Sequence, residues 1–318
     1  MPKPFERALE LAERGRGTTH PNPVVGAVVV AGHEVVGEGW HQRAGSPHAE
    51  VVALEAAGDR TRGATLYVTL EPCAHYGRTP PCVDAIIAAG IARVVVGAPD
   101  PNPKTDAQGF ARLRQSGMDV ELLDGEPARR ARRQNEAWRT WIAAGRPFVT
   151  YKTAVTLDGR VVVPESRWVT GEESRRRVHD LRAASDAVAV GMGTVRADAP
   201  RLDARDLEAA RQPRRLAFGR GPLPEDSELE LVSGPLDETL KRLAAEGVQS
   251  LLLEGGPTLA SSFLREVLVD KLLLFVAPTL AGSGRRWVDE LGAALPLAGL
   301  DAERVGDDLL LTGYIREP

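Results

Sequence analysis

Short apolar segments typical of strands alternate with helix-like segments along the chain, and this alternation limits the folds open to it. In the first half, residues 65–70 and 92–97 are expected to be buried strands, with a helix over 83–89 between them. In the second half, residues 185–191 and 250–253 are also expected to be strands, and each is followed by a glycine-bearing turn. Strands that alternate with helices form a mainly buried sheet covered on both faces, so the sequence predicts an α/β fold.

The remaining predicted elements continue this pattern, and a stretch rich in Gly, Pro and acidic residues over 219–234 is expected to be a loop. In the first half the pattern predicts helices over residues 4–14, 49–57 and 126–144, with Ser46 capping the second, and a hairpin of residues 24–30 and 35–39. In the second half it predicts strands that begin at residue 148 and cover 272–277 and 309–314, and a helix over 259–264.

The length of 318 residues suits two domains of about 150 residues each. Residues 145–147 (Gly-Arg-Pro) end the predicted helix 126–144, which places a domain boundary between 1–145 and 146–318. No apolar run reaches the roughly 18 residues that a membrane helix needs, and the N-terminus lacks a secretion signal, so we expect a cytoplasmic protein with no membrane partner. The net charge of −4 argues against a nucleic-acid partner.

Three residues in the first half have the types and the order of a zinc site. His48 precedes Glu50 by two residues, and Cys73 and Cys82 are the only cysteines in the chain. Zinc takes imidazole and thiolate ligands in a tetrahedron, and three protein ligands leave the fourth position to water, as a catalytic site requires. Glu50 can move protons beside the metal, and the order resembles the zinc deaminase signature, except that eight residues separate the cysteines instead of two.

Two turns in the second half could approach a phosphate group. Residues 191–194 and 255–258 each place glycine between a predicted strand and a helix, where backbone N–H groups can bind an anion. Neither turn is the G-x-G-x-x-G dinucleotide fingerprint, and tight turns without a ligand explain them equally well.

Longer motifs identify a family. Residues 18–26 (TTHPNPVVG), 37–50 (GEGWHQRAGSPHAE) and 69–82 (TLEPCAHYGRTPPC) resemble the bifunctional riboflavin-biosynthesis deaminase/reductases of bacteria. The long cysteine spacing is typical of that family. Residues 152–160, 168–170, 178–182, 190–195 and 253–259 are similar to its reductase domain.

The resemblance implies a cytidine-deaminase-like three-layer α/β/α domain followed by a dihydrofolate-reductase-like α/β domain, and a homodimer. The implied substrate is 2,5-diamino-6-ribosylamino-4(3H)-pyrimidinone 5′-phosphate, a phosphorylated pyrimidine. Zn²⁺ would serve the deamination, and NADPH would then reduce the ribose to a ribityl chain. In the deaminase domain the matching positions place the substrate at Asn22, His41, His75, Asp100 and Asn102.

In the reductase domain the resemblance makes Asp198 the substrate-binding or catalytic acid. Arg182 and Arg205 are candidates to bind the substrate phosphate, and Glu254 is a further substrate-binding residue. The cofactor would contact Lys152, Thr170, Gly191, Thr194, Gly255, Gly256 and Thr258. The chain departs from the family pattern at Ala199 and Thr279, where Asp and Lys are usual, in lacking an Asp after residues 216–218, and in a short segment over 210–250. A deaminase whose reductase-like domain has lost turnover is therefore an alternative. A zinc module that binds nucleic acid through Arg129–Arg133 is another, against which the acidic balance argues.

Overall fold

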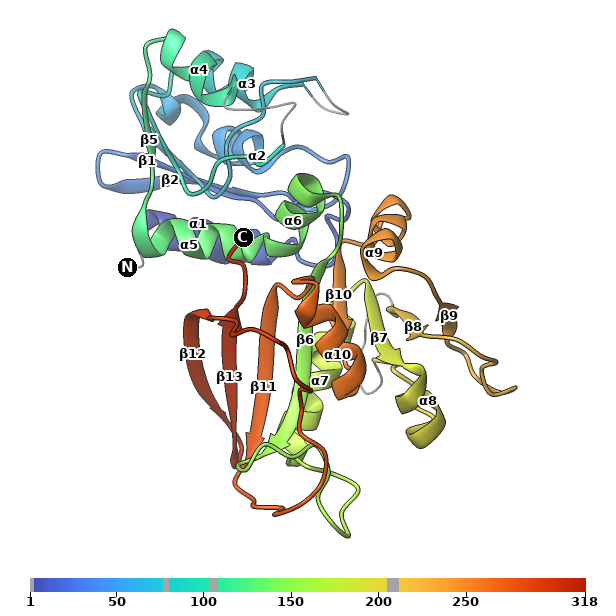
Figure 1. The fold of residues 1–318 in the computed structure, drawn as a ribbon. Helices are drawn as coiled ribbons and strands as arrows, with labels where there is room; N and C mark the ends of the chain where they lie inside the picture. Colours follow the sequence, from blue (N-terminus) through green and yellow to red (C-terminus); the bar gives the residue numbers. More distant parts are fainter. Residues whose placement is uncertain (1–2, 77–79, 103–107, 205–211) are drawn as a thin grey trace. The chain divides into compact units, whose positions relative to one another are not determined.

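The computed structural model describes residues 3–76, 80–102, 108–204 and 212–318, which form two compact units. The first unit contains Met1–Ala144 and Pro318, and the second contains Gly145–Glu317 (Figure 1). Within the described residues, no helix combines the length and the apolar character needed to cross a bilayer.

The first unit is built around a five-stranded sheet with the order β2-β1-β3-β4-β5. β1 pairs antiparallel with β2 and β3, whereas β3, β4 and β5 are parallel. Its strands are β1 (Gly26–Ala31), β2 (Glu34–Trp40), β3 (Thr65–Val68), β4 (Arg93–Val96) and β5 (Asp119–Leu122). Its helices are α1 (Pro4–Glu13), α2 (Ala49–Ala57), the 3₁₀ turn η1 (Gly58–Thr61), α3 (Cys82–Ala88), α4 (Gln108–Gln115), α5 (Gly125–Gln134) and α6 (Glu136–Ala144).

Alternating side chains of this sheet pack against different helices. Ala27 and Val29 of β1 face a core that includes Ala53 of α2 and Ile86 of α3. Val28, between them in sequence, packs instead against α1. Because successive strand residues point to opposite faces, this packing makes the three-layer α/β/α arrangement that the sequence predicts.

Two glycines let α2 lie directly on β2. A Cβ atom added to Gly39 would lie 2.4 Å from the carbonyl oxygen of Ala49, and one added to Gly37 would lie 2.1 Å from that of Ala53. We therefore expect Gly39→Ala to displace the first turn of α2 and to lower the free energy of unfolding of this unit by roughly 1–3 kcal/mol in urea unfolding. Gly171→Ala is the control for a glycine-to-alanine change: it lies in the second unit, its Cβ would make only an ordinary 3.6 Å contact with Asp308, and it should leave the stability of both units nearly unchanged. Equal stability of the two variants would contradict this packing argument.

The second unit contains an eight-stranded sheet with the order β12-β13-β11-β6-β10-β7-β8-β9. The strands from β11 to β9 in this order are parallel, and β13 and β12 are added antiparallel at one edge. The strands are β6 (Phe148–Thr156), β7 (Ala187–Gly191), β8 (Arg214–Phe218), β9 (Glu230–Val232), β10 (Ser250–Leu253), β11 (Lys271–Ala277), β12 (Ala298–Val305) and β13 (Asp308–Tyr314). The helices are α7 (Glu172–Ala183), α8 (Met192–Asp198), α9 (Leu236–Ala245) and α10 (Pro257–Arg265).

The structure corrects several local predictions. The predicted helix 126–144 is two helices, α5 and α6, with Asn135 at the break. β9 lies inside the predicted loop 219–234, and β12 was not predicted, because a three-residue strand and a largely exposed strand show no apolar alternation. His48, and not Ser46, is the N-cap of α2. The predicted bounds 49–57 are confirmed, and Glu50 lies in the first turn of the helix.

Candidate metal centre and cofactor cavity

Three side chains from separate segments of the first unit converge on one point. His48 precedes α2, Cys73 lies in the loop after β3, and Cys82 is the first residue of α3. The Nδ1 atom of His48 lies 3.3 Å from the Sγ atom of Cys82 and 3.4 Å from that of Cys73. The two sulfur atoms are 2.8 Å apart, and both cysteines are free. All three ligand atoms therefore lie within reach of one ion.

The donor set fits zinc. One imidazole and two thiols are the soft and borderline ligands that zinc takes at about 2.0–2.3 Å. A hydrogen bond with Cys82 lowers the pKa of the Cys73 thiol to about 4, and His48 contributes to the same effect. Among the described residues, no fourth His, Cys, Asp or Glu joins the group. Such a three-ligand set is typical of a catalytic zinc site.

Glu50 lies beside this centre and is almost fully enclosed. It occupies the first turn of α2 and is 3% exposed. Burial raises the pKa of its carboxyl, while the charge of His48 acts in the opposite direction. The carboxyl is also in hydrogen-bond contact with Cys82. A buried carboxyl next to the metal ligands is placed to exchange protons with a group bound there.

Two of the predicted substrate residues contact each other next to the metal ligands. The ring of His41 is 5.5 Å from that of His48, and its Nδ1 atom lies 3.2 Å from the carbonyl oxygen of Pro47. Because a carbonyl only accepts, Nδ1 carries the proton, and Nε2 accepts the hydrogen bond from the Asn22 amide at 3.1 Å. Burial lowers the pKa of His41, which favours this neutral form.

Asp100 and Asn102 form a turn after β4, and a buried acid that sequence reasoning missed holds this turn. The Asp100 side chain accepts a hydrogen bond from the Asn102 amide at 2.9 Å. The Glu71 carboxylate accepts one from the Asp100 amide at 3.2 Å. An acid directly after a buried strand was the available signal. His75 is exposed, and no contact among the described residues joins it to this group.

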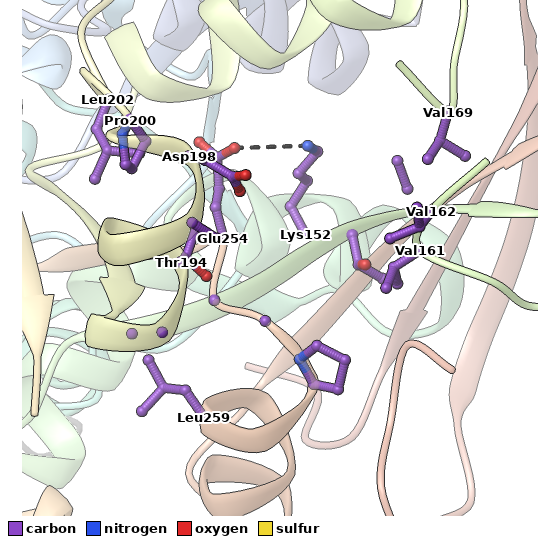
Figure 2. Close-up of a pocket in the computed structure, with 18 of the residues that line it drawn as sticks. Lys152, Val161, Val162, Val169, Thr194, Asp198, Pro200, Leu202, Glu254 and Leu259 are labelled. Carbon is purple, nitrogen blue, oxygen red and sulfur yellow. Dashed lines mark ion pairs between the residues drawn. The ribbon is translucent and has the colours of Figure 1, made fainter. Parts of the chain in front are cut away.

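A cavity of about 1340 Å³ in the second unit gathers the predicted reductase residues. It lies at the carboxyl ends of the parallel strands β6, β7 and β10. Open α/β sheets bind their ligands at this edge. Figure 2 shows Lys152, Thr194, Asp198 and Glu254 at this cavity. Every predicted residue of this unit that the structure describes lines it: Lys152, Thr170, Arg182, Gly191, Thr194, Asp198, Glu254, Gly255, Gly256 and Thr258. Arg205 lies outside the described residues.

The charged centre of the cavity is a buried cluster around Glu254. The Nε and Nη2 atoms of Arg182 donate to its carboxylate at 2.6 and 3.1 Å, and the Nζ atom of Lys152 lies 3.5 Å away. Burial alone would raise the pKa of Glu254, but the charges of Lys152 and Arg182 outweigh it and lower that pKa. Arg182 also donates to the carbonyl oxygen of Asp203, so three of its N–H groups are already in use.

The two glycine-bearing turns open onto the same cavity. Gly191 and Gly256 are the N-caps of α8 and α10, and both helices begin at the cavity wall. Arg285, which was not predicted, also lines the cavity and donates to the hydroxyl of Thr258 at 3.1 Å. Ala199, where the family usually has Asp, adopts a left-handed conformation with φ of 40°. Asp198, one residue before it, is exposed at the cavity wall.

Known families match both units. The family model for the cytidine and deoxycytidylate deaminase zinc-binding region matches residues 3–98, and that for the RibD C-terminal domain matches residues 147–311. The riboflavin biosynthesis protein RibD of Aquifex aeolicus is 40% identical over 342 residues, which cover 96% of this chain and 95% of the relative. The protein of the same name from Escherichia coli is also 40% identical, with 96% of each chain covered.

Solved structures resemble the full chain. The structure of Acinetobacter baumannii RibD in form 1 has a TM-score of 0.86 and 37% identity, and the match covers 98% of this chain and 97% of that one. A diaminohydroxyphosphoribosylaminopyrimidine deaminase/5-amino-6-(5-phosphoribosylamino)uracil reductase from Thermotoga maritima has a TM-score of 0.82 and 33% identity, with the same coverage.

The fold and the two sites define an enzyme class in which a zinc-binding, cytidine-deaminase-like unit is followed by a dihydrofolate-reductase-like unit of the RibD C-terminal kind. This confirms the predicted fold class. With 40% identity over nearly its full length, the chain belongs to the riboflavin biosynthesis protein RibD family, as its motifs indicated.

Proposed function

We propose that this chain catalyses two successive steps of riboflavin biosynthesis, with deamination by residues 1–145 and reduction by residues 146–318. The substrate is 2,5-diamino-6-ribosylamino-4(3H)-pyrimidinone 5′-phosphate. The observation that carries the proposal is the convergence of His48, Cys73 and Cys82 beside the buried carboxyl of Glu50.

The deamination adds water at an amino-bearing carbon of the pyrimidine and releases ammonia, which leaves a carbonyl group on the ring. Zinc, when held by His48, Cys73 and Cys82, would lower the pKa of water to about 7. Glu50 takes a proton from the attacking water and returns it to the departing amine. His41 carries its proton on Nδ1 and accepts a hydrogen bond from Asn22 at Nε2. This hydrogen bond fixes the side-chain amide of Asn22 in an orientation suited to bind the pyrimidine ring. Asp100 and Asn102 follow β4, which is parallel to β3, so they lie at the same edge of the sheet as Cys73 and are proposed to contact the substrate there.

The reduction converts the ribose carbon C1, in its ring-opened form, into a CH₂ group of a ribityl chain. NADPH would supply the hydride, and the N-terminal turns of α8 and α10 would receive its phosphates. Glu254 holds Lys152 and Arg182 in fixed positions at the cavity centre. Asp198, at the exposed end of α8, is the proposed acid. The complete Glu254 cluster supports a working reductase over the alternative of a deaminase that has lost this step.

A cytoplasmic location is part of the proposal, because Cys73 and Cys82 must stay reduced to bind the metal and disulfides are disfavoured in that compartment. The homodimer that the resemblance implies stays a prediction.

The function is tested on the purified full chain. We expect one zinc ion per chain by elemental analysis, ammonia release from the diaminopyrimidinone phosphate, and NADPH oxidation only after deamination. Removal of zinc by a chelator should stop ammonia release without stopping NADPH oxidation on the deaminated substrate. Ammonia release without NADPH oxidation would establish the deaminase-only alternative, and the absence of zinc from active protein would contradict the metal site.

A further inference from the structure

Glu71 is a buried acid that lies two residues before the metal ligand Cys73. It follows the end of β3 and is 5% exposed. Removing a carboxylate from water is unfavourable unless hydrogen bonds compensate, so its position calls for a specific set of donors. Those donors are backbone amides from two other segments of the first unit.

Each carboxylate oxygen of Glu71 serves a different segment. Oε2 accepts from the amide of Asp100 at 3.2 Å, and Oε1 accepts from the amide of Phe110 at 3.4 Å. Phe110 lies in the first turn of α4, where free N–H groups and the helix dipole favour a negative charge. Gly109 permits this approach, because a Cβ atom there would lie 2.1 Å from the carbonyl oxygen of Pro72.

The backbone of Glu71 adds a further link to the same turn. Its amide donates to the carbonyl oxygen of Ala98 at 2.9 Å. Beyond Ala98, the Asp100 side chain accepts from the amide of Asn102, and Arg139 donates to the carbonyl oxygen of Pro99 at 2.7 Å. The turn that carries Asp100 and Asn102 is thus joined to the segment that carries Cys73 through both the side chain and the backbone of Glu71.

We propose that Glu71 is a positioning residue of the deaminase, which fixes the Asp100–Asn102 turn relative to the metal ligand Cys73. This inference rests on the proposed function. It requires both carboxylate oxygens, since each accepts from a separate amide. Glutamine has one acceptor oxygen and would leave one of the two amides facing an NH₂ group.

The test is Glu71→Gln in the zinc-loaded full chain, with ammonia release measured against substrate concentration. We expect KM for the pyrimidine to rise roughly tenfold to a hundredfold, because a hydrogen bond to a charged group is lost, while kcat falls less than threefold. Zinc content should stay at that of the wild type, and NADPH oxidation on the deaminated substrate should not change. Glu55→Gln, on the exposed side of α2, is the control and should match the wild type.

A double-mutant comparison tests whether Glu71 acts on KM through the Asp100–Asn102 turn. In an Asn102→Ala background, Glu71→Gln should raise KM much less than it does alone, because the group that it positions is already gone. Additive effects of the two substitutions on KM would overturn the inference. So would an unchanged KM in Glu71→Gln, or a Glu71→Gln enzyme that loses zinc while its zinc-loaded fraction has normal kinetics. A wild type that releases no ammonia would instead contradict the proposed function.

A measurement on the wild type keeps the inference testable if the variants do not fold. The amides of Asp100 and Phe110 should exchange with deuterium far more slowly than those of an unfolded chain, since both are held by a buried carboxylate. Exchange of either amide at the unfolded rate would overturn the proposal.

Discussion

Replacing Glu50 by glutamine is expected to lower the rate of ammonia release by roughly 10²–10⁴-fold and to leave NADPH oxidation on the deaminated substrate unchanged. Glutamine has nearly the shape of the acid but cannot take a proton from the attacking water. Because Glu50 is 3% exposed, bulk water has little access to replace it as a base. The measurement is ammonia release at saturating substrate, with zinc content determined on the same samples.

The control for this prediction lies on the same helix. Glu55→Gln makes the same chemical change on the exposed side of α2 and should retain full activity and zinc. If Glu50→Gln loses zinc in proportion to activity, Glu50 supports the metal site and is not the proton carrier. Undiminished ammonia release in zinc-loaded Glu50→Gln would show that another group moves the proton.

The metal site could be predicted because its chemistry depends on residue type. Cys is a rare residue type and a strong zinc ligand, and the chain has only two cysteines and six histidines, so few combinations of Cys and His exist. Glu71 could not be assigned a role in the same way, because its partners are the backbone amides of Asp100 and Phe110. Every residue type except proline supplies such an amide, and its position depends on the fold.

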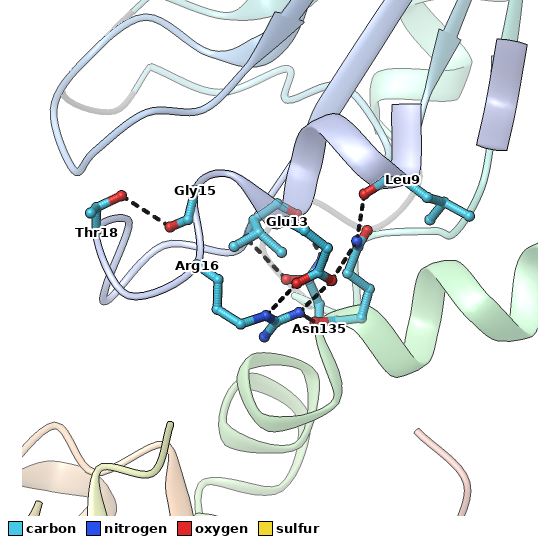
Figure 3. A network of polar contacts seen from close by, with 8 residues as sticks. Leu9, Glu13, Gly15, Arg16, Thr18 and Asn135 are labelled. Atoms are coloured by element: carbon cyan, nitrogen blue, oxygen red, sulfur yellow. Dashed lines mark hydrogen bonds and ion pairs between the residues drawn. The ribbon is translucent and has the colours of Figure 1, made fainter. Parts of the chain in front are cut away.

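The break between α5 and α6 shows the same limit. The Asn135 side chain donates to and accepts from the backbone of Val24, with both hydrogen bonds at 2.9 Å. Next to it, Gln134 donates to the carbonyl oxygen of Leu9 and to Glu13, which also binds Arg16 (Figure 3). These contacts connect segments more than 100 residues apart. The apolar period of residues 126–144 carries no information about them, so it predicted one continuous helix.

Glu254→Gln is expected to remove most of the reductase activity and to lower the free energy of unfolding of the second unit by roughly 3 kcal/mol. Arg182, Lys152 and Glu254 have side chains 14%, 15% and 9% exposed, so loss of the carboxylate removes the anion that two poorly hydrated cations share. Breaking a buried ion pair from one side commonly costs about 3–5 kcal/mol. NADPH oxidation on the deaminated substrate and urea unfolding at pH 7 measure the two effects, and ammonia release should be unchanged.

The pH dependence of stability separates the charge of Glu254 from its shape. Because Lys152 and Arg182 lower its pKa below the ordinary value of about 4.5, the ionised acid stabilises the folded state at neutral pH. The stabilisation is complete above about pH 4.5, the pKa of Glu254 in the unfolded chain. It is lost as the pH falls from there through the lower pKa that Glu254 has in the folded protein. The stability difference between wild type and Glu254→Gln should therefore be largest near pH 7 and shrink below about pH 4.5. Glu246→Gln breaks an exposed pair with Arg214 and should change stability by less than about 1 kcal/mol at any pH. A difference for Glu254→Gln that is constant down to pH 3 would mean that packing, and not its charge, supports the cavity.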